Sequence, residues 1–526
     1  MRYFLGLLAV AWLLSLGLVP AVAQDDASPS PASLLDRYLH FPAEREALRP
    51  RLLALGADAL AALIRDYPRP AVPAAGEHKF ETVCPDGFTR PYWVRIPKGY
   101  DGVTPAVLVV CLHGGVMAAP VDSGVAIMRW YGIHIDKREN PRPIITMAAS
   151  ADCYETWMNA AWWRDAGRAN VLHFVRECKL RFPIDPERVF VTGFSDGGSG
   201  SFSMAFNSPD VFAGYLPMCG DPLIPITDDI MHAWSNLKGA QIHAFNGAKD
   251  PIYPGKEIEK IFKEGNKAGA NIDWIIDPEA THDWGDPDII FPRNLALIDT
   301  WTRPAVPDTI DWTADRASRR EWISIDETGC LSKAANKAKK PAPREGGSYR
   351  IDLGIKVPIT HQPHEKPVVG RVDQGSLAET MGVKAGDLVK SLNGQAVGSF
   401  GEIRMQLAQL RAGDEVKLVI EREGVQHTLT GTITRPAKRT VGRLEAKRAG
   451  SVTVEVHDVT KFSIWVSPGM LDAKGEISVR LNNQTVFTGK VDADPAVLLD
   501  EFTRSGEREG RYIHRIQIDV KQPKRR

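Results

Sequence analysis

A serine flanked by glycines is the first place in the chain where residue types and spacing could do chemistry. The run Gly193-Phe194-Ser195-Asp196-Gly197 follows the apolar run Val189–Thr192 and precedes a helix-compatible segment, Ser201–Phe206. A strand, a sharp turn and a helix in this order can present a serine hydroxyl as a nucleophile. The flanking glycines lack the Cβ atoms that would keep strand and helix apart. The pattern therefore predicts that Ser195 is a nucleophile, if the chain supplies a base.

A base and an orienting acid follow at suitable places. A serine hydroxyl reacts only when a base takes its proton and a third group holds that base in the right tautomer. Asp250 lies on the turn that directly follows the predicted strand Gln241–Phe245, and His282 comes after the predicted strand Ile272–Ile276. We therefore predict that Ser195, Asp250 and His282 are catalytic, with His282 as the general base and acid and Asp250 as its partner.

Other residues compete for two of these roles. Asp221 follows the predicted strand Ala213–Met218 and is an alternative acid. His243 lies inside a predicted strand, which is typical of a packed core residue. His113 precedes two glycines and is better suited to shaping a loop. We favour Asp250 and His282 over these alternatives.

Backbone N–H groups near the serine could stabilise a developing oxyanion. Gly114 and Gly115 follow the apolar run Ala106–Leu112, and both can turn their N–H groups toward a negative oxygen. The N–H of Asp196, directly after the serine, would be the second donor. We predict that Asp196, Gly114 and Gly115 form this oxyanion hole.

Strands and helices alternate through the region that holds these residues. Continuous apolar runs separated by helical stretches are typical of a parallel sheet covered on both faces. The predicted buried strands are Ala106–Leu112, Ile144–Ala148, Arg188–Phe194, Ala213–Met218, Gln241–Phe245 and Ile272–Ile276. The fold class is therefore predicted as α/β, with a doubly wound, mostly parallel sheet.

The N-terminus and the charge balance bear on the compartment and on partners. Arg2, the apolar run Phe4–Leu18 and the small residues Ala21-Val22-Ala23 have the pattern of a secretory signal peptide. An uncleaved anchor is the alternative, although the run is shorter than the roughly 20 apolar residues of a membrane span. The chain has 65 basic and 65 acidic residues, which gives no reason to expect a nucleic-acid partner. We expect an exported protein, periplasmic or secreted. Its six cysteines allow 15 disulfide pairings.

The motifs together resemble a known superfamily. Leu112–Gly115, Asp185–Ser195, Asn246–Pro254 and the loop that ends in His282 look like the α/β hydrolases, and in particular exported esterases of the polyhydroxybutyrate depolymerase and feruloyl esterase type. The resemblance covers roughly residues 78–302 and implies cleavage of carboxylic esters through an acyl-enzyme, without metal or cofactor. The chain departs from the pattern at Asp196, where these esterases commonly carry methionine or another uncharged residue.

Tryptophans near the predicted catalytic residues suggest a substrate pocket. Trp284 lies two residues after His282, and Trp157 lies in a predicted loop of the same region. Aromatic side chains often line pockets for apolar or aryl ligands. We predict that Trp284 and Trp157 line the pocket, with core packing as the alternative.

A second resemblance lies further along the chain. Ile351–Ile355, Val368–Val372, Gly375–Ala378, Gly382–Asp387 and Leu392–Gly394 look like a PDZ domain of the bacterial exported type. PDZ domains bind extended peptides, often C-termini, at a sheet edge. The resemblance implies that Leu353, Gly354 and Ile355 flank the carboxylate-binding loop. A purely structural spacer is the alternative.

These observations predict the following organisation and function. The segments are a signal peptide (1–23), a helical segment (24–77), an α/β-hydrolase domain (78–302), strands that belong to a C-terminal β-domain (303–332), a linker (333–348), a PDZ domain (349–436) and a β-rich C-terminal domain (437–526). The strands of Thr309–Asp326 are assigned to the last domain because an isolated hairpin is marginally stable in water. The predicted function is ester hydrolysis with peptide or protein binding at the PDZ domain. A serine peptidase of the prolyl oligopeptidase type and a non-catalytic peptide-binding scaffold are the alternatives.

Overall fold

The protein is described by a computed structural model, which divides into two compact units, Met1–Ala54 and Leu55–Arg526. The described residues are 29–116, 122–139, 142–151, 161–224, 231–341, 353–356, 366–372, 375–407, 410, 413–433 and 440–521. The smaller unit contains two helices, α1 (Pro31–His40) and α2 (Arg45–Leu53), joined by a short 3₁₀ turn. Each of them has an apolar, buried face.

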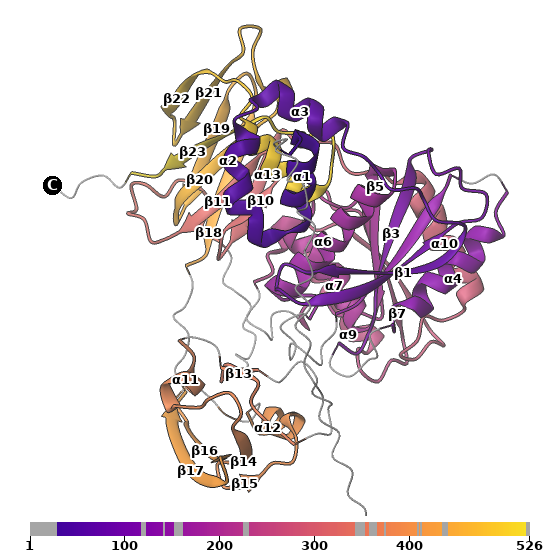
Figure 1. Cartoon of the computed structure of the whole chain (residues 1–526), viewed down its shortest axis with the longest axis vertical. Helices are drawn as coiled ribbons and strands as arrows, with labels where there is room; N and C mark the ends of the chain where they lie inside the picture. Colours follow the sequence, from indigo (N-terminus) through magenta and orange to yellow (C-terminus); the bar gives the residue numbers. More distant parts are fainter. Residues whose placement is uncertain are drawn as a thin grey trace, which may run out of the picture. The chain divides into compact units, whose positions relative to one another are not determined.

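A mixed eight-stranded sheet forms the core of the larger unit (Figure 1). Its strands are β1 (Gly76–Val83), β2 (Thr89–Ile96), β3 (Ala106–Leu112), β4 (Ile144–Ala149), β5 (Ile184–Phe194), β6 (Gly214–Met218), β7 (Ile242–Gly247) and β8 (Ile272–Asp277). They are arranged in the order β1-β2-β4-β3-β5-β6-β7-β8. β2 is antiparallel to both of its neighbours, and β3 to β8 are all parallel. The carboxyl ends of six strands therefore meet at one edge of the sheet.

Helices cover both faces of this sheet, as Figure 1 shows. They are α4 (Val125–Asp136), α6 (Asp165–Arg181), α7 (Asp196–Asn207), α9 (Gly255–Lys267) and α10 (Pro287–Thr300). Leu108 and Val110 of β3 pack with side chains of α6, α7 and α9, whereas Val109 and Cys111 pack with side chains of α4 and α10. Because both faces are covered, every residue of β3 is buried. The predicted α/β fold class, with a doubly wound, mostly parallel sheet, is confirmed. None of the helices in the described part of the chain is long and apolar enough to span a membrane.

Two further sheets form a β-domain from segments that are far apart in sequence. Its strands are β9 (Thr309–Ala314), β10 (Ser318–Arg320), β11 (Ile323–Thr328), β18 (Gly442–Arg448), β19 (Val452–His457), β20 (Val459–Val466), β21 (Glu476–Leu481), β22 (Gln484–Lys490) and β23 (His514–Asp519). One sheet has the order β22-β21-β19-β18-β9 and the other the order β10-β11-β20-β23. β9 pairs with β18 and β11 with β20, so each sheet joins strands from both segments.

The junction between the two segments is well packed. Trp312 and Trp322 are buried in one apolar cluster with Phe462 and Ile464. The N–H of Trp465 donates to the carbonyl of Trp322 at 2.8 Å. Asn482 and Asn483 form a two-residue hairpin turn between β21 and β22, because both residues have positive φ (48° and 66°) and Leu481 pairs with Gln484.

The PDZ region lies between β11 and β18 in the sequence. Its elements are β12 (Ile355–Lys356), β13 (Arg371–Val372), α11 (Leu377–Met381), β14 (Leu388–Leu392), β15 (Gln395–Ala396), α12 (Phe400–Leu407), β16 (Glu415–Arg422) and β17 (Val425–Thr432). β12 pairs with β13, and the other strands form a sheet in the order β15-β14-β16-β17. The region has an apolar core of its own, around Val389, Val416 and Leu418. Buried Asp387 accepts two hydrogen bonds from Arg422 beside this core.

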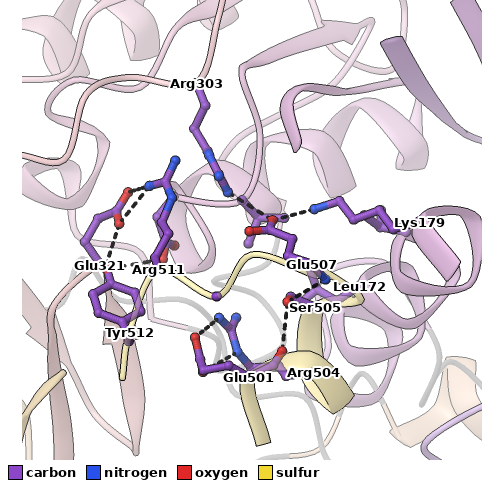
Figure 2. A pocket seen from close by; sticks show the side chains of 14 residues that line it. Leu172, Lys179, Arg303, Glu321, Glu501, Arg504, Ser505, Glu507, Arg511 and Tyr512 are labelled. Atoms are coloured by element: carbon purple, nitrogen blue, oxygen red, sulfur yellow. Dashed lines mark hydrogen bonds and ion pairs between the residues drawn. The ribbon is translucent and has the colours of Figure 1, made fainter. Parts of the chain in front are cut away.

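A buried cluster of charges joins the hydrolase domain to the β-domain (Figure 2). Glu507 follows α13 (Pro495–Ser505), and its carboxylate lies 2.7 Å from Lys179 of α6 and 3.2 Å from Arg303. Burial alone would raise the pKa of Glu507, but the charges of Lys179 and Arg303 outweigh it and hold that pKa at about 2. Close by, Arg511 bridges carboxylates from the two domains. These ion pairs therefore link the two domains.

We expect Glu507→Gln to destabilise the protein by about 3 kcal/mol, because it leaves Lys179 buried with an uncompensated charge. The exposed pair Lys249–Glu279 gives a matched control, since Glu279→Gln should change stability by less than about 1 kcal/mol. Urea unfolding measures the change in the free energy of unfolding for both variants. The folded-state pKa of Glu507 is depressed, so its contribution is complete above about pH 4.5 and is lost as the pH falls toward about 2. Equal effects of the two variants would contradict this assignment.

Candidate active site

Ser195 lies on the strained turn between β5 and α7. Its backbone has φ 56° and ψ −118°, which is unusual for a residue with a side chain. Such a conformation costs on the order of 1–3 kcal/mol and persists only when the surroundings enforce it. Here the N–H of Ser195 donates to the carbonyl of Met218 at 2.9 Å, and α7 begins at the next residue. The turn therefore fixes the serine at the carboxyl end of β5.

Two glycines permit the close backbone contacts around this turn. A Cβ on Gly197 would lie 2.0 Å from the carbonyl oxygen of Leu112, at the end of β3. A Cβ on Gly193 would lie 2.3 Å from the carbonyl oxygen of Gly197. These distances exclude any side chain at either position, so the Gly-x-Ser-x-Gly spacing follows directly from the packing.

The structure brings Ser195, His282 and Asp250 together in a hydrogen-bonded chain. Oγ of Ser195 lies 2.9 Å from Nε2 of His282, and Nδ1 of His282 lies 2.8 Å from Oδ2 of Asp250. The side chain of Asp250 is fully buried, and its Oδ1 accepts the N–H groups of Ile252 and Tyr253 at 2.8 and 2.9 Å. The carboxylate is thus fixed by its own loop, with its second oxygen directed at the imidazole. This arrangement can accept the serine proton on Nε2.

The alternative residues lie in other surroundings. Oδ1 of Asp221 accepts the N–H of Leu223 at 2.7 Å, and burial raises the pKa of Asp221. His243 is buried in β7, with Nδ1 2.6 Å from the carboxylate of Asp273 on β8. Among the described contacts, the imidazole that faces Ser195 is therefore that of His282 and its carboxylate partner is Asp250.

The loop after β3 is held against the serine turn. A Cβ on Gly114 would lie 3.0 Å from the Cβ of Ser195, and Gly115 has φ 62°. Nε2 of His113 accepts the N–H of Ala151 at 3.1 Å, so the proton of this neutral imidazole is on Nδ1, which donates to the carbonyl of Gly114. Burial lowers the pKa of His113 and keeps it neutral. His113 thus shapes the loop that carries Gly114 and Gly115.

The carboxylate of Asp196 is hydrogen-bonded to the loop after β3. Its Oδ2 accepts the N–H of Val116 at 2.9 Å. The side chain therefore reaches from the first residue of α7 to the loop after β3. The backbone N–H of Asp196 is in the first turn of α7, where N–H groups have no partner within the helix. The carboxylate of Asp196 thus links the start of α7 to the loop after β3.

Aromatic side chains surround the imidazole. The ring of Phe194 lies 5.1 Å from that of His282 and 5.3 Å from that of Trp284, and Tyr253 approaches His282 edge-on at 5.7 Å. The structure thus brings the predicted pocket residue Trp284 close to the serine. Trp157 lies outside the described residues.

Two neighbours of the triad residues are not among the predicted site residues. Tyr253 stands three residues after Asp250 in the same loop, so its position could have been inferred from the predicted site of Asp250. Cys219 follows β6 directly, and its Sγ lies 2.9 Å from the carbonyl oxygen of Asp283, beside His282. Cys219 stands at the same strand end as Asp221, so its position near the site could have been inferred from the predicted strand Ala213–Met218.

Comparison with known proteins finds a matching family model for the PDZ region and several relatives of parts of the chain. A family model described as PDZ domain matches residues 351–433, and the chain contains this domain. The "Probable periplasmic serine protease do/HhoA-like" of Haemophilus influenzae is 37% identical over 83 residues, which are 16% of this chain and 17% of that protein.

Other relatives are named for ester hydrolysis. The chain is 28% identical to "Poly(3-hydroxyalkanoate) depolymerase C" of Paucimonas lemoignei over 178 residues, 30% of this chain and 41% of that protein. It is 29% identical to "Probable feruloyl esterase C" of Aspergillus terreus over 167 residues, 31% of this chain and 51% of that protein. The chain thus spans about half the length, or less, of these curated relatives. A solved thermostable esterase aligns over 43% of this chain and 63% of its own, with 20% identity and a TM-score of 0.34.

Proposed function

We propose that the protein is an exported serine hydrolase that cleaves carboxylic esters through an acyl-enzyme on Ser195. The observation that carries this proposal is the hydrogen-bonded chain Ser195–His282–Asp250, with separations of 2.9 and 2.8 Å. The similarity to a polyhydroxyalkanoate depolymerase and a feruloyl esterase supports an ester rather than another acyl substrate. The signal-like residues 1–23 and the match to a periplasmic protein support export.

In the first step, Oγ of Ser195 attacks the ester carbonyl while Nε2 of His282 takes the hydroxyl proton. The fixed carboxylate of Asp250 holds the imidazole with its proton on Nδ1 and stabilises the imidazolium that forms. The imidazolium then gives its proton to the departing alcohol oxygen, which leaves an acyl-serine. Water, deprotonated by the same imidazole, releases the acid and restores Ser195.

The negative oxygen of the tetrahedral intermediate needs donors on the side of the turn that faces β3. We assign these donors to the backbone N–H of Asp196 and to the Gly114-Gly115 loop. The carboxylate of Asp196 accepts the N–H of Val116, which directs its charge toward the loop backbone. Phe194 and Trp284 offer an apolar wall beside the imidazole, which suits an aryl or other apolar group of the ester.

Ser195→Ala and His282→Ala should each lower kcat on p-nitrophenyl esters by about 10⁶-fold, and Asp250→Asn by about 10⁴-fold. A fluorophosphonate probe should label the wild type and Ser478→Ala, a control in the β-domain, but not Ser195→Ala. Labelling that survives Ser195→Ala would exclude Ser195 as the nucleophile. Hydrolysis of peptide amides as fast as of esters would favour the alternative of a serine peptidase.

Asp196→Ala should lower kcat by about 10–100-fold, less than the loss of a whole oxyanion donor, because it frees the Val116 N–H and loosens the glycine loop. Asp196→Asn keeps an acceptor oxygen and should stay within a few-fold of the wild type. Steady-state kinetics on the same ester measure both variants. Equal losses in the two variants would show that the negative charge matters rather than the hydrogen bond to Val116.

We also propose that the PDZ domain binds the C-terminus of a peptide or protein. Leu353 is buried, Gly354 has φ 80°, and Ile355 begins β12, which pairs with β13. The carbonyl of Leu353 accepts the N–H of Ala378, which fixes the start of this strand. A peptide carboxylate would lie on the loop at Gly354, with the chain extended along a strand edge.

Hexapeptides with apolar C-terminal residues should bind the full-length protein in fluorescence anisotropy, and amidation of their C-terminus should abolish binding. Gly354→Val should weaken binding at least about 10-fold, because valine disfavours positive φ. Gly424→Val is the matched control, since Gly424 has the same φ of 80° in the turn between β16 and β17. Equal binding by free and amidated peptides would contradict recognition of a C-terminus, and binding of neither would favour the structural-spacer alternative.

A further inference from the structure

The side of the imidazole that faces away from Ser195 contains a third potential ligand group. Sγ of Cys219, a carboxylate oxygen of Asp250 and a ring nitrogen of His282 all lie within 4.8 Å of one another. Nε2 of His282 faces Ser195, so the nitrogen on the carboxylate side is Nδ1. These three groups come from the loops after β6, β7 and β8, which are adjacent strands.

Cys219 is held firmly in this position. It is completely buried and has φ 46°, and its N–H donates to the carbonyl of Phe245 at 2.6 Å. Its thiol is free and directs Sγ to the carbonyl of Asp283. Burial raises the pKa of Cys219 to about 12, so the group is a neutral thiol in the free protein.

Thiolate, imidazole and carboxylate together form a donor set that suits zinc. Zinc bonds of about 2.3 Å to sulfur and about 2.0–2.2 Å to nitrogen and oxygen place tetrahedral ligand atoms about 3.3–3.6 Å apart. The longest separation, up to 4.8 Å, must therefore contract by about 1 Å. The 2.8 Å between Nδ1 of His282 and Oδ2 of Asp250 must widen by about 0.5 Å to admit the ion. Three protein ligands leave the fourth position for water. His282 is 18% exposed, which leaves a route for a small ion.

We propose that Cys219, Asp250 and His282 form an inhibitory binding site for a divalent cation of the zinc class. As the metal–sulfur bond forms, the Cys219 thiol releases its proton to solvent. As Nδ1 of His282 binds the metal, the proton on Nδ1 is released to solvent and Nε2 takes up one proton from solvent, so the ring stays neutral and the net release is the single thiol proton. Nε2 then donates toward Ser195 and no longer accepts its proton. Binding needs no catalytic activity, whereas inhibition rests on the proposed function.

The binding step is tested in the full-length Ser195→Ala protein, which keeps all three ligands and has no nucleophile. Titration with Co²⁺ should produce a thiolate-to-cobalt charge-transfer band in the near ultraviolet, and Zn²⁺ should displace it with one ion bound per chain. Adding Cys219→Ser should remove the band and weaken Zn²⁺ binding by more than about 100-fold, because a direct ligand is lost rather than an outer-shell partner. Adding Cys330→Ser, a change at an exposed cysteine outside this site, should leave both the band and the Zn²⁺ affinity unchanged.

A second substitution tests the metal site in case the Cys219→Ser protein does not fold. Asp250→Asn in the Ser195→Ala background keeps the thiol but weakens the donor set, so the cobalt band should persist with lower affinity. A band that survives Cys219→Ser, or no band at millimolar Co²⁺, would overturn the proposal. An enzyme without esterase activity that still shows the Cys219-dependent band would refute the proposed function and leave the metal site standing.

Discussion

The contact between the backbones of α7 and β3 determines where the chemistry of this protein can occur. The helix approaches the strand so closely at Gly197 that a single Cβ atom would overlap the carbonyl of Leu112. This approach forces Ser195 into its positive-φ turn and exposes its hydroxyl at the carboxyl edge of the sheet. The loops after β7 and β8 end at the same edge, which explains why Asp250 and His282 can reach the serine from sequence positions 55 and 87 residues away.

Asp196 carries a negative charge directly after Ser195, where the esterases that this chain resembles commonly have an uncharged residue. A carboxylate next to an oxyanion would oppose the negative charge that develops there. Because its Oδ2 accepts the N–H of Val116, that charge is partly balanced and directed toward the glycine loop. The same hydrogen bond links the start of α7 to the loop after β3. The residue thus ties together the two elements to which we assign the oxyanion donors.

The sequence predicts the structure best where an element depends on a local residue pattern or on the order of segments along the chain. Continuous apolar runs that alternate with helical stretches predict the parallel strands, and Ser195, Asp250 and His282 follow three of these strands. The marginal stability of a lone hairpin predicts that β9 and β11 belong to the β-domain. Contacts across long separations left no local pattern. Glu507 meets Lys179 across 328 positions, and Cys219 approaches His282 only because β6, β7 and β8 are neighbours. Propensity describes a segment, whereas these contacts depend on how the segments pack.

Because Cys219 is neutral, it can lie beside Asp250 and His282 in the free protein and still serve as a ligand in the proposed metal site. A thiolate at this position would compete with Asp250 for the imidazolium and would repel the carboxylate at short range. Burial keeps the proton on sulfur, so the thiol can lie beside the triad without disturbing its charge balance. A divalent cation removes that restriction, because metal coordination itself stabilises the thiolate. The packing that keeps Cys219 neutral in the free protein therefore also places three potential metal ligands, Cys219, Asp250 and His282, close together.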